Sequence, residues 1–528
     1  MNVRNGDPAA SIRKDFGDWQ TPPGLVDAVL DRLGPIGGRF DRVLEPTCGH
    51  GAFLAGLLRR PDRPREIRGF EIQPAHCEAA RAVAAAAPRD VRAVVELADL
   101  FRVDLGALDW AEAGRLLVVG NLPWVTVAGL GASGGVDTAP RSNPHGSRGL
   151  DALTGASNFD ISEALWIKLI RELAHERPTI ALLGKTAVAR NLFRTLELAD
   201  LPVVTSRLYR IDAHRWFGAA VDAGLLVAEI GPGEKARELP VHDGLDAPAP
   251  SVRIGRSGNR LIADLDAYRK VAHADGICGI EWRQGIKHDA ADVMELVDDG
   301  DRIRNRRGEV VDVEPEYLFP LLKGSDLAAK DGPRPRRLVI VTQPRLNHPT
   351  DALEQEAPRL WRYLQDHAED FDRRRSSIYR GRPRFALFGV GDYTFAPGKV
   401  AVSGFHKEPK FRAIAPVDGR PVLFDDTCYF LPFETPAEAE EVAALLNGRE
   451  ALDLIQALSF RDAKRPITKA LLGRLDLAAL RRIGDHDRPP SPLTTATHPT
   501  RPTDGFRDDP VSEPVLAESI GLQHHLPR

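Results

Sequence analysis

The sequence predicts an α/β fold, a parallel sheet flanked by helices, followed by a second domain of α+β type. From about residue 39 to residue 230, short apolar runs alternate with helical stretches, which is typical of a parallel sheet with crossover helices. After residue 230 this alternation stops, and β-rich runs with glycine turns follow. The 528 residues, 43% hydrophobic and 28% charged, suffice for more than one globular domain.

The first domain is expected to combine apolar strands with alanine-rich crossover helices. Strands are predicted at residues 40–45, 67–72, 94–97, 116–120, 179–183 and 225–230. Residues 75–87 and 161–173 have the composition of crossover helices. Residues 131–149 are rich in Gly, Ser, Pro and Asn, which predicts a long mobile loop of the kind that often forms a lid.

Composition divides the rest of the chain into a linker, a second domain and a tail. Residues 231–250 combine proline, glycine and charge, as linkers do. The second domain is expected over residues 251–484. Its clearest predicted elements are β-rich runs at 336–342 and 383–395 and a helix near 437–446. Residues 488–528 are crowded with Pro, Thr and His and have almost no aromatic residues, so they are predicted to be disordered.

Charge and cysteine content narrow the possible functions. The chain has 71 Lys and Arg against 75 Asp and Glu, a net charge of −4, so any nucleic-acid surface must be local. The four cysteines form no CxxC pair, which favours a reducing cytoplasm and no structural zinc. We find neither a signal peptide nor a membrane span, and we expect no metal site.

A glycine turn follows the first predicted strand, in Glu45-Pro46-Thr47-Cys48-Gly49-His50-Gly51. A Gly-x-Gly turn that opens a helix lets a ligand approach the backbone at the carboxyl end of a strand, where open α/β sheets bind ligands. The turn lacks both the GxGxxG spacing and the P-loop lysine, so a dinucleotide or a triphosphate fits poorly. Taken alone, the motif is also compatible with a tight structural turn.

Acidic residues follow the next two predicted strands. Glu71 closes the second strand, where a carboxylate can accept both hydroxyls of a ribose. Asp99 follows the third strand, within reach of an adenine amino group. An isolated acid at a strand end is usually only solvated. The order and spacing of these two acids after the glycine turn favour a ligand site instead.

The fourth predicted strand is followed by Asn121-Leu122-Pro123-Trp124. An amide and a rigid backbone carbonyl can accept both hydrogens of an exocyclic amine, while an aromatic ring stacks on the base. Here the chain resembles the amino-methylating S-adenosylmethionine-dependent DNA methyltransferases, whose fourth motif is Asn/Asp/Ser-Pro-Pro-aromatic. Other family motifs match in order, at Gln20-Thr21-Pro22-Pro23, residues 45–54, Glu71, Asp99, residues 158–162 and Trp216-Phe217-Gly218.

The motif order resembles that of the gamma group of adenine-N6 enzymes. This resemblance implies a Rossmann-like class I methyltransferase domain over residues 15–235, with S-adenosyl-L-methionine as cofactor. It assigns cofactor binding to Thr21, Glu45, Thr47, Gly49, Gly51, Glu71, Ile72, Asp99 and Leu100. It assigns catalysis to Asn121, Leu122, Pro123 and Trp124, together with Phe217 against the flipped adenine or beside it.

Leu122 departs from the family motif, because a proline most often stands at that position. Asn-Leu-Pro-aromatic looks like the fourth motif of the rRNA adenine dimethyltransferases, so an RNA adenine-N6 methyltransferase is the alternative function. The Thr21-Pro22-Pro23 element and the large C-terminal domain favour DNA. Leucine keeps the backbone carbonyl of residue 122 and loses only the rigidity of proline. A second alternative, a non-enzymatic DNA-binding module, conflicts with the intact motifs.

The C-terminal domain resembles the target-recognition domains of restriction-modification enzymes. The similarity lies in Trp282-Arg283-Gln284-Gly285-Ile286-Lys287 and in residues 317–327. Residues 371–412 carry ten Lys and Arg against three Asp and Glu, a net charge of +7, with aromatic residues interleaved, which predicts a phosphate-tracking surface. DNA contacts are predicted for Arg380, Arg382, Arg384, Lys407, Lys410 and Arg412. A solvated basic face is the alternative.

Together these motifs predict a site-specific DNA methyltransferase that transfers a methyl group to N6 of a flipped adenine. Duplex DNA is the expected partner, in a restriction-modification or phage-defence system. We find no PD…(D/E)xK nuclease segment, so a separately encoded restriction endonuclease or other defence-system proteins are the further partners compatible with the sequence.

Overall fold

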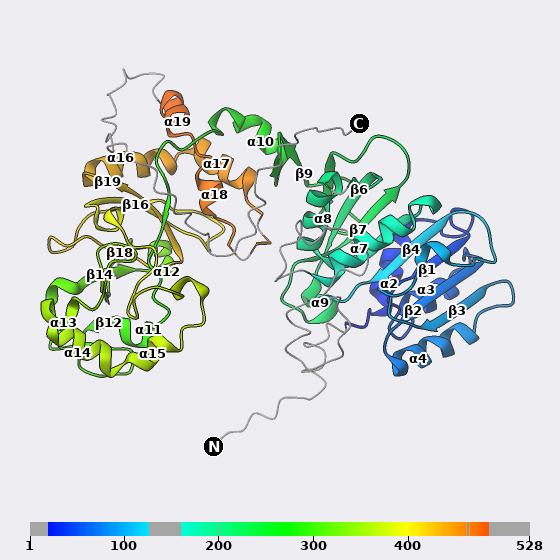
Figure 1. Cartoon of the computed structure of the whole chain (residues 1–528). Helices are drawn as coiled ribbons and strands as arrows, with labels where there is room; N and C mark the ends of the chain where they lie inside the picture. Colours follow the sequence, from blue (N-terminus) through cyan, green and yellow to red (C-terminus); the bar gives the residue numbers. More distant parts are fainter. Residues whose placement is uncertain (1–18, 126–159, 199, 461, 464, 485–528) are drawn as a thin grey trace, which may run out of the picture. The chain divides into compact units, whose positions relative to one another are not determined.

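The computed structural model describes residues 19–125, 160–198, 200–460, 462–463 and 465–484 (Figure 1). The loop predicted at 131–149, the tail predicted at 488–528 and the expected domain start at residues 15–18 lie outside the described residues. The chain divides into two compact units between Leu261 and Ile262. This boundary lies later in the chain than residue 251, where the second domain was expected to begin.

The first unit is built on a ten-stranded sheet whose described strands have the order β10-β9-β8-β6-β7-β5-β4-β1-β2-β3. They are β1 (Arg42–Glu45), β2 (Glu66–Glu71), β3 (Arg92–Leu97), β4 (Leu116–Asn121), β5 (Thr179–Lys185), β6 (Val203–Ile211), β7 (Ala223–Ile230), β8 (Glu238–His242), β9 (Val252–Ser257) and β10 (Arg260–Ile262). Strands β1 to β5 pair in parallel, and β7 runs antiparallel to both β5 and β6.

Helices cover both faces of this sheet. They are α2 (Pro23–Leu33), α3 (Ala52–Arg59), α4 (Pro74–Ala85), α7 (Ile161–Glu172), α8 (Thr186–Leu198) and α9 (Ala213–Phe217), with short 3-10 helices η1 (Leu105–Ala107) and η2 (Ala174–Glu176). Neighbouring strand residues point to opposite faces. Leu225 of β7 packs in the core that includes α2, α3 and α4, whereas Leu226 faces α8.

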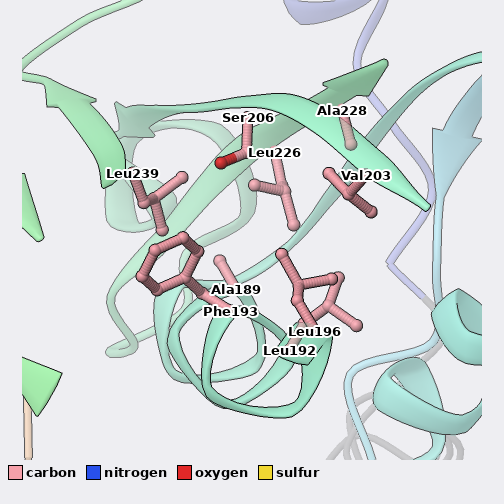
Figure 2. Close-up of a pocket in the computed structure, with 9 residues that line it drawn as sticks. All are labelled: Ala189, Leu192, Phe193, Leu196, Val203, Ser206, Leu226, Ala228 and Leu239. Atoms are coloured by element: carbon pink, nitrogen blue, oxygen red, sulfur yellow. The ribbon is translucent and has the colours of Figure 1, made fainter. Parts of the chain in front are cut away.

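A small apolar pocket lies between α8 and strands β6, β7 and β8 (Figure 2). It is lined by Ala189, Leu192, Phe193, Leu196, Val203, Ser206, Leu226, Ala228 and Leu239. Only one of these nine residues, Ser206, has a polar side chain, and none of them is a predicted site residue. The pocket therefore belongs to the packing of α8 on the sheet.

The second unit holds two sheets, ordered β13-β12-β15-β14-β18 and β11-β19-β16-β17 in the described residues. The strands are β11 (Arg283–Gln284), β12 (Glu295–Asp298), β13 (Ile303–Asn305), β14 (Leu318–Leu322), β15 (Arg337–Ile340), β16 (Gly398–Ser403), β17 (Arg412–Ile414), β18 (Leu423–Phe424) and β19 (Cys428–Phe433). The mixture of sheets and helices is the α+β type that the sequence predicted.

The helices of the second unit are short and pack around the two sheets. They are α10 (Leu265–Val271), α11 (Ala291–Met294), α12 (Gly324–Ala328), α13 (Leu353–Glu356), α14 (Pro358–Asp366), α15 (Ala368–Asp372), α16 (Pro436–Leu446), α17 (Arg449–Leu458), α18 (Lys469–Leu472) and α19 (Leu477–Gly484). The 3-10 helices are η3 (Ala272–Ala274), η4 (Pro315–Tyr317), η5 (Ser377–Tyr379) and η6 (Asp392–Phe395). Thr435 caps α16 with a capping box, and a proline occupies its first turn, so the start of this helix is well defined.

Most predicted elements are confirmed, and two segments differ. All six strands predicted in the first domain are present, as are the helices α4, α7 and α16. The expected linker at 231–250 contains β8, which extends the sheet beyond β6. The β-rich run predicted at 383–395 is wrong, because only an isolated bridge at Phe388 and η6 lie there. Its apolar residues fill the core as an irregular segment instead.

The two segments that resemble a recognition domain meet at one turn, residues 425–428. Ile286 forms a bridge with Asp425, and the backbone N–H of Gly324 donates to Thr427 Oγ1 at 2.9 Å. A Cβ atom at Gly285 would lie 2.0 Å from the carbonyl oxygen of Asp425, so only glycine fits there. Both segments therefore pack against the turn at residues 425–428.

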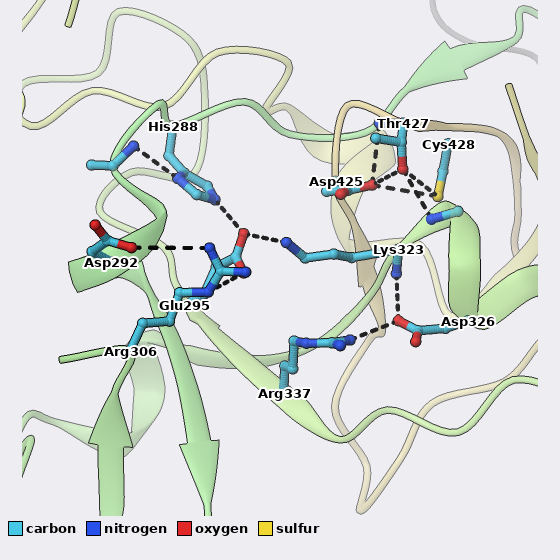
Figure 3. A network of polar contacts seen from close by, with 12 residues as sticks. His288, Asp292, Glu295, Arg306, Lys323, Asp326, Arg337, Asp425, Thr427 and Cys428 are labelled. Atoms are coloured by element: carbon cyan, nitrogen blue, oxygen red, sulfur yellow. Dashed lines mark hydrogen bonds and ion pairs between the residues drawn. The ribbon is translucent and has the colours of Figure 1, made fainter. Parts of the chain in front are cut away.

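The buried carboxylate of Glu295 links Lys323 of the second segment to His288, the residue that directly follows the first segment (Figure 3). Its Oε1 lies 2.6 Å from Lys323 Nζ and 3.5 Å from His288 Nε2. Burial acts to raise the pKa of Glu295, but hydrogen bonds with His288 and Lys323 outweigh burial and lower the pKa to about 2. Glu295 is therefore ionised at neutral pH and forms a charged link inside the second unit.

Candidate active site

The predicted site residues of the first unit gather at the carboxyl ends of β1 to β4. β1 lies between β2 and β4. Strands β2 and β3 follow on one side of β1, and strands β4 and β5 follow on the other side. A doubly wound sheet binds its ligands at such a switch point. The position of the glycine turn and of the residues after β2, β3 and β4 fits that rule.

Glu71, at the end of β2, holds the glycine turn that follows β1. The backbone N–H of Gly49 donates to Glu71 Oε2 at 2.8 Å, and the N–H of Gln73 donates to Oε1 at 2.8 Å. Each carboxylate oxygen keeps a further lone pair for a ligand. The next residue, Ile72, is 48% exposed, which places an open apolar side chain beside the carboxylate.

Glu45, at the end of β1, is buried beneath the turn. Its Oε2 accepts the backbone N–H of Leu54 at 3.0 Å, from the first turn of α3. Burial raises the pKa of Glu45 to about 8, against the opposing effect of the Leu54 and Phe53 backbone groups. The carboxyl group is therefore largely protonated at neutral pH.

The remaining predicted cofactor residues surround this turn. Thr47 Oγ1 donates to the backbone oxygen of Asn121 at 3.0 Å, which joins the glycine turn to the end of β4. Asp99 Oδ1 accepts the N–H of Phe101 at 3.0 Å, and its Oδ2 lies 3.5 Å from Arg102 Nε. Thr21 and Leu100 are both buried.

The turn after β4 is held by main-chain and side-chain hydrogen bonds. The N–H of Leu122 donates to the carbonyl of Leu183 in β5 at 3.3 Å, a bond that proline could not make. Ser162 Oγ donates to the carbonyl of Pro123 at 2.6 Å. Among the described residues, no donor is bonded to the carbonyl of Leu122. Asn158 and Phe159, of the predicted motif at 158–162, lie outside those residues.

Three aromatic side chains lie together beside Asn121. The ring centroids of Trp124 and Phe217 are 5.0 Å apart with an edge-on angle of 71°, and Trp19 lies 6.4 Å from Trp124 and 6.2 Å from Phe217. Trp124 is only 6% exposed. Sequence reasoning missed Trp19, although an aromatic residue directly before the Gln20-Thr21-Pro22-Pro23 element is a signal that could have indicated it.

The basic segment of the second unit divides into paired and exposed cations. Arg384 pairs with Asp372, Arg382 bonds to Asn347 Oδ1, and Arg412 donates to the carbonyls of Leu327 and Ala329. Arg380, Lys407 and Lys410 are exposed, and no partner for these three side chains is found in the described part of the chain. The interleaved aromatics Phe371, Phe385 and Phe411 are buried, whereas Phe405 is 36% exposed.

No cluster of three or more His, Cys, Asp or Glu side chains suited to a metal ion occurs in the described residues. The same residues contain no helix that combines the length and apolar character needed to cross a membrane.

The strand order and the glycine turn at the switch point define a class I S-adenosylmethionine-dependent methyltransferase. The chain is 37% identical to the Type II methyltransferase M.NspV from Nostoc sp. over 470 residues, which cover 89% of this chain and 98% of that protein. The chain therefore belongs to the Type II methyltransferases.

A solved structure shares the fold across most of the chain. The Type IIL restriction-modification enzyme MmeI, solved in complex with DNA, matches with a TM-score of 0.50 and 11% identity over 86% of this chain and 65% of that enzyme. No family model matches the chain. The predicted fold, the cofactor S-adenosyl-L-methionine and a methyltransferase of the restriction-modification type are confirmed, and the RNA alternative is not supported.

Replacement of Gly51 by alanine tests how closely the turn must pack. Gly51 has φ +81°, and an added Cβ would lie 3.2 Å from Ala80 Cα in α4. We expect Gly51→Ala to lower the free energy of unfolding by about 2–4 kcal/mol, from left-handed strain plus overpacking, and to weaken S-adenosylmethionine binding. Urea unfolding and calorimetry measure the two effects.

Gly38→Ala is the matched control, since Gly38 has φ +80°, in a turn closed by the Arg39 N–H and the Ile36 carbonyl, but open space around the added Cβ. It should cost only the strain of about 1–2 kcal/mol and leave cofactor affinity unchanged. Equal losses of stability and affinity in both variants would contradict the importance of the contact between Gly51 and α4.

Proposed function

We propose that this methyltransferase transfers the methyl group of S-adenosylmethionine to N6 of an adenine flipped out of duplex DNA. The observation that carries the proposal is the end of β4, where the Asn121 side chain and the Leu122 carbonyl offer two acceptors in adjacent residues. The Thr47–Asn121 hydrogen bond joins these acceptors to the glycine turn. The arrangement suits an exocyclic amine, which has two hydrogens to donate.

The residues after β1, β2 and β3 fit an adenosine-containing cofactor. The lone pairs left on Glu71 can accept the two ribose hydroxyls, and the exposed Ile72 can lie against the adenine ring. Asp99 follows at the neighbouring strand end, with its Oδ2 held only at 3.5 Å by Arg102. When bound, S-adenosylmethionine supplies an electrophilic methyl group on a sulfonium.

The chain itself contributes orientation and electrostatics to methyl transfer. The lone pair of an adenine amine is delocalised into the ring and is a weak nucleophile. Hydrogen bonds accepted by Asn121 Oδ1 and the Leu122 carbonyl localise that lone pair and aim it at the methyl group. No general base is needed before transfer, because the product ammonium can lose its proton to water.

Asn121→Ala tests the function directly. The variant should bind cofactor and DNA like the wild type but lower the single-turnover rate of methyl transfer by about 100-fold, the usual loss for a transition-state hydrogen bond. Labelled methyl transfer to unmodified genomic DNA gives the rate, and nucleoside mass spectrometry identifies the product.

Asn191→Ala serves as control, because Asn191 bonds to Glu163 Oε2 at 3.4 Å in the same unit, away from the end of β4. It should leave the rate unchanged. A wild-type product other than N6-methyladenine, or an Asn121→Ala enzyme with wild-type rate, contradicts the proposed function.

Glu45 makes cofactor binding depend on pH. Its pKa of about 8 means that the buried carboxyl is mostly neutral at pH 7, and a bound cation favours the ionised form. Binding therefore releases a proton, so affinity for S-adenosylmethionine should rise as pH is raised toward 8 and level off above it.

The Glu45→Gln variant cannot ionise at this position and should lose that rise, as measured by calorimetry between about pH 6 and pH 9. The comparison with the variant removes the titration of the cofactor's own amino group, which affects both proteins. If the affinity of both proteins for S-adenosylmethionine changes with pH in the same way, the ionisation of Glu45 is not coupled to cofactor binding.

The second unit is proposed to bind the DNA backbone through its exposed cations. The six residues that the sequence singled out contribute unequally, because Arg382, Arg384 and Arg412 already have partners within the unit. Arg380, Lys407 and Lys410 are the cations best placed to exchange solvent for phosphates. A separately encoded endonuclease that cuts the same sequence is compatible with this role. Because the proposed substrate is the cell's own DNA, we expect the enzyme in the cytoplasm.

Replacement of Arg380, Lys407 and Lys410 together by glutamine should weaken binding to a short duplex of arbitrary sequence. The plot of log affinity against log salt should flatten by up to about 0.9 for each phosphate that the variant no longer neutralises. Fluorescence anisotropy at several salt concentrations provides the slope.

The control replaces the ion pair Arg384–Asp372 by the neutral pair Arg384→Gln with Asp372→Asn, which conserves net charge. Its salt slope should match the wild type. If the triple variant keeps the wild-type slope, DNA follows a different face of the second unit.

A further inference from the structure

The side-chain amide of Asn121 is hydrogen-bonded at both ends. Its Nδ2 donates to the backbone carbonyl of Trp19 at 3.0 Å, and its Oδ1 accepts the indole Nε1–H of Trp124 at 3.0 Å. A carbonyl can only accept and an indole N–H can only donate. The two partners therefore determine which end of the amide is the oxygen, although the two ends have nearly the same shape.

The orientation of this amide decides whether Asn121 can act on an amine. If the amide were turned over, its NH₂ group would face the two donors of an exocyclic amine, and donors repel one another. In the observed orientation Oδ1 has two lone pairs, of which Trp124 takes one. The second lone pair remains for the substrate.

We propose that Trp124 is a positioning residue, and that its indole N–H together with the Trp19 carbonyl locks the Asn121 amide with its oxygen toward the substrate amine. The proposal rests on the function proposed above and goes beyond it. The resemblance to DNA methyltransferases gives Trp124 only a stacking role, which any aromatic ring could serve.

The surroundings of Trp124 support positioning over stacking. Its ring is 6% exposed and packs edge-on with Phe217, within a cluster that also holds Ala213 and Ala219. Packing on this scale keeps the indole in one rotamer and so fixes the direction of its N–H. A phenylalanine at this position would fill most of the space but would leave the Asn121 oxygen without its orienting donor.

The segment that carries Trp19 also contacts the glycine turn between β1 and α3. The neighbouring Gln20 accepts the backbone N–H of His50 through its Oε1 at 3.1 Å. Residues 19 and 20 therefore touch both the amide of Asn121 and the turn between β1 and α3. Hydrogen bonds to these two neighbouring residues therefore connect the Asn121 amide to the glycine turn.

Trp124→Phe tests the lock by removal of one N–H with little loss of volume. We expect the single-turnover methylation rate to fall about tenfold or more, the equivalent of one hydrogen bond, while the dissociation constants for cofactor and DNA stay within about twofold. Trp110→Phe is the control, because Trp110 stacks with Arg42 and Arg68 and does not touch Asn121. It should keep the wild-type rate.

A double-mutant cycle separates orientation from packing. In an Asn121→Asp background, both side-chain oxygens are acceptors. Either of them can face the substrate amine, so the side chain no longer needs to be held in one orientation. Trp124→Phe should then lower the rate much less than it does in the wild type. An equal fold-loss in both backgrounds would assign the effect to packing and would overturn the proposal.

Indole nitrogen resonances report on the lock without any turnover. The chain has seven tryptophans, and the signal that disappears in Trp124→Phe identifies the Trp124 indole. In the full-length protein labelled with ¹⁵N-tryptophan, Asn121→Ala should shift that signal upfield as its acceptor is removed. An unshifted signal would overturn the lock, whereas a wild-type enzyme that makes no N6-methyladenine would overturn only the proposed function.

Discussion

The parallel pairing of β1 with β4 is the constraint on which the site depends. Their register, from Arg42 opposite Leu116 to Leu44 opposite Val118, brings the end of β1 at Glu45 close to the end of β4 at Asn121. Thr47 can then donate to the Asn121 backbone, so a side-chain hydrogen bond links the glycine turn to the turn after β4. A slip of one residue would turn every side chain of either strand to the opposite face.

Residues at strand ends were predictable, whereas the contacts that orient them were not. Glu45, Glu71 and Asn121 stand next to apolar runs that mark buried parallel strands, so their common edge follows from sequence alone. Trp19 bonds to Asn121 across about a hundred residues, and local spacing gives no sign of that pairing. The orientation of the amide could therefore be learned only from the structure.

Composition predicted the basic segment of the second unit but overstated its exposed charge. Lys399 counts toward the positive sum, yet it lies in β16 at 1% exposed, and burial lowers its pKa to about 7. Arg384 is neutralised by Asp372, and buried aromatics such as Phe385 belong to the core. A charge count cannot distinguish a cation that faces solvent from one that the fold has already paired.

Leu122 shows how a motif can change while its geometry is kept. Proline at this position would stiffen the turn through its ring but would have no N–H. Leucine supplies an N–H that extends the ladder between β4 and β5 to the Leu183 carbonyl, and Ser162 holds the next carbonyl along the turn. These two hydrogen bonds hold the turn after β4 where a proline ring would otherwise have stiffened it. Since the proposed acceptor is the carbonyl of residue 122, the side chain at this position does not distinguish a DNA substrate from an RNA substrate.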